Sequence, residues 1–430
     1  MCIRDRYTYD DKYVLSGSIR WDRSNLWGTN SKYQNKPLWS VGGSWNIYKE
    51  KFFQADFVDM LKLRASYGIG GNIGRNTAPY LIASYYDSSL VDGMAGSVNT
   101  PPNKDIRWEK TTTVNVGVDF ALFRHRLSGT IEYYNKYSVD LLAAINGSPT
   151  QGFGYTTLMT NNGKMVNRGV EITLSGEIIR QKDFSWNASL LYAFNRNKVK
   201  HISVQPSLWD SRISMPTSYP MVGKPLYGIY AYKWAGLNEN GDPQVYDAEN
   251  NVTSGPARDY HALVYCGTTV PIHNASLTNV LRYKGFEFSA MLILDAGHKL
   301  RSSNIPSINM SNGRITSTAK GIVDRWTQPG DVTDVPRLLF SNDTENFNTH
   351  RTELYRYSDL FVYDASNIRL SNISLAYRVP AHWCKKISLS GARLQFNVEN
   401  VATFAFDSKA NYDLGGKVKP NYVWGLYLNF

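Results

Sequence analysis

The residue types that most often carry chemistry are present in this chain without the spacings that catalysis or metal binding requires. The seven histidines include no HxxxH or HExxH pair, and His201, His261, His273 and His350 each stand alone. Isolated histidines are expected in loops or at surfaces. None lies beside a nucleophile in a recognisable motif, so we expect no enzyme activity, no catalytic residue, no metal site and no cofactor.

Two local patterns resemble functional sites only in part. Asp331 and Asp334 could act as an acid–base pair or as calcium ligands, but they lie in a Pro-Gly turn, where capping and turn formation are the expected roles. The segment Gly70-Gly71-Asn72-Ile73-Gly74 has the glycines of a phosphate cradle. It lacks the following helix and the Lys-Ser/Thr pair, so we interpret it as the entry to a loop.

The composition favours strands that are apolar on one side only. Aromatic residues make up 13% of the 430 residues, with 29 Tyr and 11 Trp, while the mean hydropathy is −0.37. This combination suits an outer-membrane barrel, and it also suits a large soluble β protein. No apolar run approaches the roughly 18 residues of a membrane-spanning helix, since the longest, Met291-Leu292-Ile293-Leu294, ends at Asp295.

The charge and the cysteines exclude several classes of protein. The formal net charge is +11, but Lys and Arg are scattered singly, as on a solvated surface or lumen, so no nucleic-acid partner is expected. Cys2, Cys266 and Cys384 have no CxxC spacing, which gives no support to a zinc or redox site. A disulfide between Cys266 and Cys384 is left open.

Alternation of apolar and polar residues recurs from end to end and predicts the fold. At the C-terminus, Tyr422, Trp424, Leu426, Leu428 and Phe430 form one face. Several such runs reach about nine to eleven residues, the length of a tilted strand that spans a bilayer. We expect an all-β protein, a partial antiparallel transmembrane β-barrel of about fourteen strands. The strands are expected near 13–22, 38–47, 61–69, 111–122, 126–137, 166–178, 184–195, 226–236, 274–283, 285–294, 366–378, 387–399 and 421–430, with one more between 237 and 271.

The expected connections alternate between short and long. Short turns fall at 123–126, 180–183, 283–285 and 379–386, and long loops at 70–110, 138–165, 196–225, 295–365 and 401–421. Outer-membrane barrels have short periplasmic turns and long extracellular loops. The strand between 237 and 271 is required by up-and-down parity, and a helix is expected at 318–327.

Motifs spread along nearly the whole chain resemble one family. They are Leu63-Arg64-Ala65-Ser66-Tyr67-Gly68 with Gly71-Asn72, 106–111 with 115–120, Tyr133-Tyr134-Asn135-Lys136 with Asp140-Leu141-Leu142, Asn161-Asn162-Gly163 with 167–171, 326–331 with 334–337, 368–375, and Val398-Glu399-Asn400-Val401. In this order they are similar to the barrel of SusC/RagA-type TonB-linked outer-membrane proteins, which are TonB-dependent receptors.

The resemblance implies a function and a set of partners. It implies import of oligosaccharides or peptides across the cell outer membrane, with a SusD-like surface lipoprotein as a lid. It also implies energy from TonB-ExbB-ExbD, delivered through an N-terminal part, and contact with outer-membrane lipid. The sequence does not choose between a glycan and a peptide substrate. A passive porin or structural barrel is the alternative.

The family's signal peptide, plug and earlier strands are not visible in this sequence, and plugged barrels have about 22 strands. We therefore expect residues 7–430 to be the C-terminal part of a TonB-dependent receptor barrel. Residues 1–6 are interpreted as a non-native or junction segment.

Aromatic residues supply the only candidates for ligand contact. Those in the expected outer loops could stack on sugar rings or hold peptide side chains, and could equally form the interfacial girdle or pack the loops together. They are Trp27, Tyr85, Tyr86, Trp209 and Tyr219. The final residue, Phe430, resembles the signal by which the outer-membrane assembly machinery recognises its clients, with an ordinary aromatic strand end as the alternative.

Overall fold

The fold is taken from a computed structural model of the chain. It describes residues 2–22, 30, 37–74, 79–90, 93–148, 150, 157–205, 211–255, 259–310, 318–340, 349–415 and 419–430. No helix in these ranges has the length and apolar character needed to cross a membrane.

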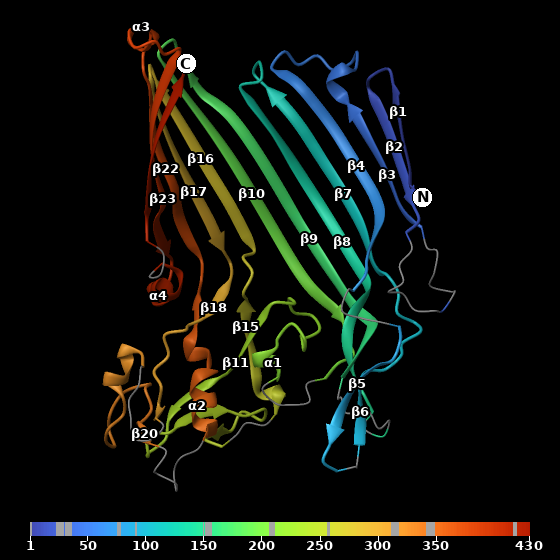
Figure 1. Ribbon diagram of the computed structural model, residues 1–430, viewed down its shortest axis with the longest axis vertical. Coiled ribbons are helices and arrows are strands. Elements are labelled where there is room, and N and C mark those ends of the chain that lie inside the picture. Colours follow the sequence, from blue (N-terminus) through green and yellow to red (C-terminus); the bar gives the residue numbers. More distant parts are fainter. Residues whose placement is uncertain are drawn as a thin grey trace.

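Thirteen strands form one antiparallel sheet in which each strand pairs with its neighbours along the chain (Figure 1). This confirms the expected all-β class. In order across the sheet, the strands are β1 (Cys2–Tyr9), β2 (Tyr13–Arg20), β3 (Leu38–Asn46), β4 (Val58–Asn72), β7 (Glu109–Leu122), β8 (Leu127–Asn146), β9 (Thr157–Arg180), β10 (Phe184–His201), β16 (His273–Tyr283), β17 (Phe286–Ala296), β22 (Asn367–Arg378), β23 (Gly391–Ala405) and β24 (Asn421–Asn429).

The connections differ at the two ends of the sheet. The expected short turns lie at one end, which we call the turn end, with the small helix α3 (Ala381–Lys385) in the turn between β22 and β23. Figure 1 shows this end at the top and the long connections at the bottom, which we call the loop end. The arrangement is the one expected for an outer-membrane barrel.

The strand register places apolar residues on one face of the sheet. Because neighbouring residues of a strand point to opposite faces, every second paired row belongs to the same face. One complete apolar row is Tyr13, Trp45, Leu63, Val118, Ile131, Ile172, Tyr192, Ala275, Leu294, Ile368 and Phe404. The adjacent row, on the other face, is Ser44, Arg64, Gly117, Glu132, Glu171, Ala193, Asn274, Asp295 and Asn367. We call these the apolar face and the polar face.

Two expected strands are not part of this sheet, which corrects the sequence-based topology. The segment expected at 226–236 forms β11 (Gly228–Tyr232), which pairs with β15 (Leu263–Thr268), and β12 (Trp234–Leu237), which pairs with β13 (Pro243–Tyr246). All five residues of β11 are buried, so this strand lacks the one-sided alternation of a barrel strand. β10 pairs directly with β16. The up-and-down alternation of the sheet is kept because two expected strands, the one at 226–236 and the one between 237 and 271, both lie outside it.

Two further expectations fail in detail. The loop expected at 138–165 is largely strand, because β8 continues to Asn146 and β9 begins at Thr157. The register shifts between Ser138 and Leu141, and Asp140 has φ +57. This bulge interrupts the period of two that marks a strand in the sequence. The helix expected at 318–327 is a short 3-10 helix, η5 (Lys320–Asp324).

The long connections contain the remaining elements. They are the hairpin β5 (Ile82–Ser88) and β6 (Gly93–Thr100), β14 (Val252–Thr253), β18 (Lys299–Arg301), β19 (Asn309–Met310), β20 (Leu339–Phe340), β21 (Val362–Asp364), α1 (Ser211–Ser214), α2 (Thr349–Arg356), α4 (Asn411–Leu414), η4 (Tyr260–Ala262), η6 (Asp359–Phe361) and η7 (Ser408–Ala410). At the turn end, η2 (Ile47–Lys49) follows β3.

Candidate functional site: the polar face and the outer-loop unit

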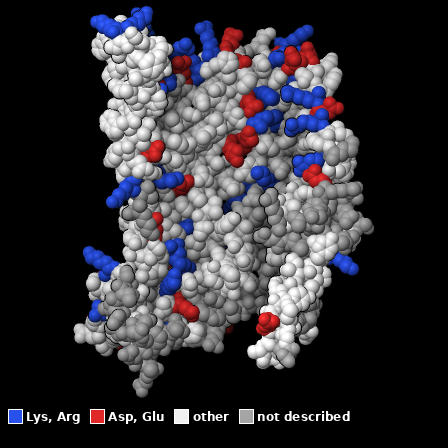
Figure 2. Space-filling view, in the orientation of Figure 1, with Lys and Arg blue, Asp and Glu red and all other residues white. Residues whose placement is uncertain are grey.

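The polar face of the sheet carries charges of both signs. Figure 2 shows Lys, Arg, Asp and Glu interspersed on the face turned to the viewer, most densely over the first strands and toward the turn end. A hollow on this face, over β1 to β4, is lined by Arg4, Arg6, Lys62 and Arg64 around small residues such as Ser16. Because the central side chains of this hollow are small, another protein surface has room to approach the sheet there.

Arg64 is the centre of a network on this face. Its Nε donates to Asp119 at 3.1 Å, and its guanidinium also pairs with Glu132. Asn115 donates to Glu132 at 3.2 Å, and Thr130 donates to Asp119 at 3.1 Å. These residues come from three adjacent strands, so the network fixes charged groups at defined positions on the wall.

Three of the family-like motifs meet at the loop end of β7, β8 and β9. Arg107 Nη2 donates to Asp140 at 2.7 Å. The side-chain amide of Asn161 donates to the carbonyls of Arg107 at 2.8 Å and Asp140 at 2.7 Å, and its oxygen accepts from the Arg107 backbone at 3.0 Å. The backbone N–H of Leu142 donates to Glu109 at 2.9 Å. The motifs therefore hold the bulge of β8 in place.

The two longest connections fold together at the loop end. We call their described residues, 211–255, 259–272, 297–310, 318–340 and 349–366, the outer-loop unit. Its core includes Tyr230 and Tyr232 from β11 and Leu354 and Tyr355 from α2, each at most 1% exposed. Among the described residues, neither of the two buried hydrophobic clusters has a core residue from the thirteen-stranded sheet. The unit is thus the part of the chain that is packed like a soluble domain.

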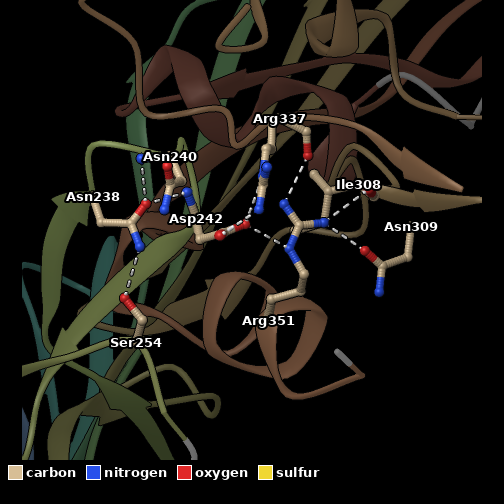
Figure 3. Close-up of polar contacts among 8 residues, drawn as sticks. All are labelled: Asn238, Asn240, Asp242, Ser254, Ile308, Asn309, Arg337 and Arg351. Carbon is tan, nitrogen blue, oxygen red and sulfur yellow. Dashed lines mark hydrogen bonds and ion pairs between the residues drawn. The ribbon is translucent and has the colours of Figure 1, made fainter. Parts of the chain in front are cut away.

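A partly buried ionic cluster joins the two connections (Figure 3). Asp242 accepts from Arg337 at 3.0 and 2.8 Å and from Arg351 Nε at 3.1 Å. Arg351, which is 3% exposed, also donates to the carbonyls of Ile308 at 3.1 Å and Arg337 at 2.8 Å. Burial lowers the pKa of Arg351, and the nearby Asp242 opposes this effect. Asn238 accepts from the Asp242 backbone at 2.9 Å and so shapes the turn that presents the carboxylate.

A second arginine joins the connections through backbone carbonyls. Arg301 donates to Tyr230 at 2.7 Å, to Arg356 at 3.1 Å and to Ser358 at 3.2 Å. Burial lowers the pKa of Arg301. The three carbonyls accept hydrogen bonds from both terminal nitrogens of this partly buried guanidinium. Sequence reasoning missed Arg301 and Arg351, since neither belongs to a turn signal or an alternating run.

The carboxylates considered for catalysis or calcium binding have structural partners. Asp331 Oδ2 accepts from Thr327 at 2.7 and 2.8 Å and from the Gln328 backbone at 3.0 Å. These hydrogen bonds lower the pKa of Asp331. Asp334 accepts from the indole of Trp234 at 3.0 Å. Both positions match turn formation and loop packing, and no group of three or more His, Cys, Asp or Glu within the described ranges could hold a metal.

The structure separates the aromatic candidates. Tyr85 and Tyr86 lie on the β5–β6 hairpin, 72% and 53% exposed, and as neighbours in one strand they point to opposite faces. Tyr219 is only 9% exposed, and its carbonyl accepts from Arg212 at 3.4 Å, so it packs inside the outer-loop unit. Trp27 and Trp209 lie outside the described residues.

Other singled-out residues have simple surroundings. Phe430 is 92% exposed, and its carbonyl accepts from Ser390 at 3.2 Å. Cys266 in β15 and Cys384 in α3 lie at opposite ends of the sheet, and both have free thiols. Burial raises the pKa of Cys266 to about 11. His273 lies within β16 on the apolar face, where its Nδ1 is 2.8 Å from the hydroxyl of Tyr192.

The sheet and its loops define the class of protein: the wall of an antiparallel barrel with one apolar face, one polar face and large folded connections at one end. Residues 2–401 match the family model described as TonB dependent receptor-like, beta-barrel. The chain therefore belongs to the TonB-dependent receptor β-barrel family, whose members lie in the bacterial outer membrane. In outer-membrane barrels of this kind an apolar face meets lipid, a polar face lines the lumen and the long loops are extracellular.

Curated relatives of the chain are named as members of the same family. The chain is 27% identical to TonB-dependent receptor P3 of Formosa agariphila over 98% of its length and 43% of the relative's. It is 25% identical to TonB-dependent receptor SusC of Bacteroides thetaiotaomicron over 92% of its length and 39% of the relative's. The chain thus spans about two fifths of the length of these relatives.

A solved structure supports the fold. The structure of the RagAB peptide transporter matches with a TM-score of 0.79 and 24% identity, over 99% of this chain and 47% of that chain. At this identity the match shows the fold alone. It agrees with the expected SusC/RagA resemblance.

Proposed function

We propose that this chain forms the C-terminal wall of a TonB-dependent importer that carries oligosaccharides or peptides across the outer membrane. The observation that supports this most directly is the two-faced sheet, with an unbroken apolar row on the lipid side and charged groups on the lumen side. The outer-loop unit adds a folded surface at the extracellular end, where a substrate arrives.

The proposal includes a larger barrel. The described sheet has two edges, because β1 pairs only with β2 and β24 only with β23. Unpaired backbone groups in a bilayer cost several kcal/mol each. Strands supplied by the same protein outside this chain close the barrel, and a plug and a TonB-contacting segment couple it to energy from the periplasm.

The proposal also includes a partner and excludes a chemical step. A SusD-like surface lipoprotein covers the outer loops and delivers the substrate. Transport requires surfaces that bind and release a substrate, without a catalytic group. The two carboxylates considered for catalysis, Asp331 and Asp334, are held by turn and loop contacts. The chain therefore acts as a transporter component and not as an enzyme.

The test is uptake by cells that carry the full-length gene and its lipoprotein partner. We expect uptake of a labelled oligosaccharide or a labelled peptide that stops when TonB is deleted and falls strongly when the lipoprotein is removed. Uptake that persists without TonB would show a passive porin. Uptake that needs TonB but not the lipoprotein would contradict the proposed partner alone.

A further inference from the structure

A candidate site apart from the polar face and the outer-loop unit lies on the lipid side of the wall. There the aromatic residues of the apolar face are followed along the strand by basic ones. Along β10 the apolar-face residues change from Tyr192 and Phe194 to Arg196 and Lys198 toward the extracellular end. A hollow of about 660 Å³ lies at this point, and its basic lining residues come from three segments of the chain. They are Arg168, Arg196, Lys198, Lys200 and Lys224. No Asp or Glu belongs to its lining.

The register sets the basic residues on the outward face. Arg196 pairs directly with Arg168, and Lys198 with Val166. The row before them on the same face is Tyr133, Val170 and Phe194. Because alternate residues share a face, Arg168, Arg196 and Lys198 continue the lipid-facing surface beyond its aromatic residues and do not line the lumen.

Distance along the strand places the hollow at the membrane boundary. Arg196 follows Phe184, the first residue of β10, by twelve residues. That span is about 40 Å along the strand and about 30 Å along the membrane normal at the usual tilt. The outward apolar band of such barrels is about 25 Å tall. The basic residues therefore lie level with the headgroups of the extracellular leaflet.

A bound anion would stabilise this cluster of basic residues by compensating its positive charge. Like charges directly opposite each other on adjacent strands destabilise a sheet, and Arg196 opposite Arg168 is such a pair. Within the residues that the structure describes, none of the five basic side chains forms an ion pair with a carboxylate. Arg168 donates to the neutral Asn135 at 3.2 Å, and Lys224 lies 4.7 Å from the ring centre of Tyr265. Neither contact neutralises the charge.

We infer that this hollow binds the phosphate groups of a phosphorylated glycolipid in the extracellular leaflet. Basic residues at a membrane surface attract anionic headgroups, and guanidinium groups fit phosphate oxygens in pairs. The aromatic residues Tyr133 and Phe194 lie on the membrane side of the hollow, where they contact the upper acyl chains or the sugar rings. The inference depends on the membrane position of the wall and is independent of what the protein imports.

The experiment uses the full-length protein, purified in detergent and placed in nanodiscs. Binding of a phosphorylated glycolipid is measured by native mass spectrometry and compared with its dephosphorylated form. The test variant is the double change Arg196→Gln and Lys198→Gln. The matched control, Lys385→Gln with Lys386→Gln, removes the same charge at the turn end, and Arg196→Lys with Lys198→Arg keeps the charge in place.

We expect the wild type to retain the phosphorylated lipid and the test variant to lose affinity by about tenfold or more, at about 1 kcal/mol for each basic residue. The control and the charge-keeping variant should bind as the wild type does. Equal binding by the test variant and the wild type would overturn the site. Equal binding of the dephosphorylated lipid would show that acyl chains alone are held. Displacement of the lipid by inorganic phosphate at matched concentration would show a site for free phosphate, which also overturns the inference.

Discussion

At the residue scale, the outer-loop unit depends on one carboxylate between two arginines. Asp242 reaches Arg337 and Arg351 from a turn whose Gly241 has φ +72 and packs against Trp326. A side chain at Gly241 would be strained by that backbone and would collide with the indole. The turn therefore fixes the position of the carboxylate, and the carboxylate compensates an arginine that is almost fully buried.

The change Asp242→Ala should loosen this unit without unfolding the barrel. Removing one partner of a buried pair leaves Arg351 uncompensated, which costs about 2 to 4 kcal/mol. Hydrogen exchange should speed up in β11, β13 and α2, while heat-modifiable migration of the barrel stays as in the wild type. The control Glu239→Ala removes an exposed carboxylate of the same connection. Equal protection in the Asp242→Ala and Glu239→Ala variants would contradict the role given to Asp242.

The sequence predicts some of these residue-scale features and not others. Asn240-Gly241-Asp242-Pro243 is recognisable as a turn, and Asp331 as a turn carboxylate, because both depend on local backbone geometry. Arg351 is not recognisable, since its side-chain partners Asp242 and Asn309 lie 109 and 42 positions away and its other partners are backbone carbonyls. For Tyr219 the sequence left ligand contact and loop packing open, and its burial depends on the packing of the outer-loop unit.

At the element scale, alternation is informative where one face of a strand meets lipid and the other meets water. The C-terminal run at 421–430 and the run at 285–294 become β24 and β17 close to their expected bounds, and the run at 184–195 becomes β10, which continues to His201. The sequence-based expectations fail where a strand no longer has lipid on one face and water on the other. β8 and β9 continue beyond the membrane through a bulge, and β11 is buried on both sides.

The facing of β10 can be tested with neighbouring residues. Leu190 pairs with Leu174 and Leu277 on the lipid side, and Ser189 pairs with Ser175 and Thr278 on the lumen side. Leu190→Lys should destabilise the barrel by about 2 to 4 kcal/mol, the cost of a cation near the bilayer midplane. Ser189→Lys should change stability little. Denaturant unfolding in lipid vesicles measures both, and a larger loss for Ser189→Lys would reverse the assignment of the faces.

Deletion of Phe430 should reduce assembly far more than stability. Its side chain is almost fully exposed, and its one described hydrogen bond is made by the backbone carbonyl, so little folding energy is lost with the ring. The amount of folded barrel in the outer membrane should fall, while Phe430→Tyr should assemble normally. Wild-type levels after the deletion would mean that Phe430 is an ordinary strand end.

At the scale of the whole molecule, the two edges of the sheet decide what the chain can do alone. β1 and β24 each lack a second neighbour among the described strands. Thirteen strands could close only by pairing β1 with β24, but an even number of reversals, twelve, separates these two strands, so they run in the same direction. That closure would be parallel, whereas barrels of bacterial outer membranes are antiparallel with an even number of strands.

This chain expressed without further sequence should therefore give no TonB-dependent uptake. Its edges would leave backbone N–H and C=O groups unpaired in lipid, at several kcal/mol each, and a register suited to a larger barrel would have the wrong shear for a smaller one. The measurement is uptake of a labelled oligosaccharide or peptide by cells carrying this chain with the SusD-like lipoprotein, beside cells carrying the full-length gene. Both proteins should be quantified in the outer membrane, so that poor insertion is separated from lost transport. Energy-dependent uptake by the chain alone would show that it closes and couples without the strands and plug that we assign to the rest of the protein.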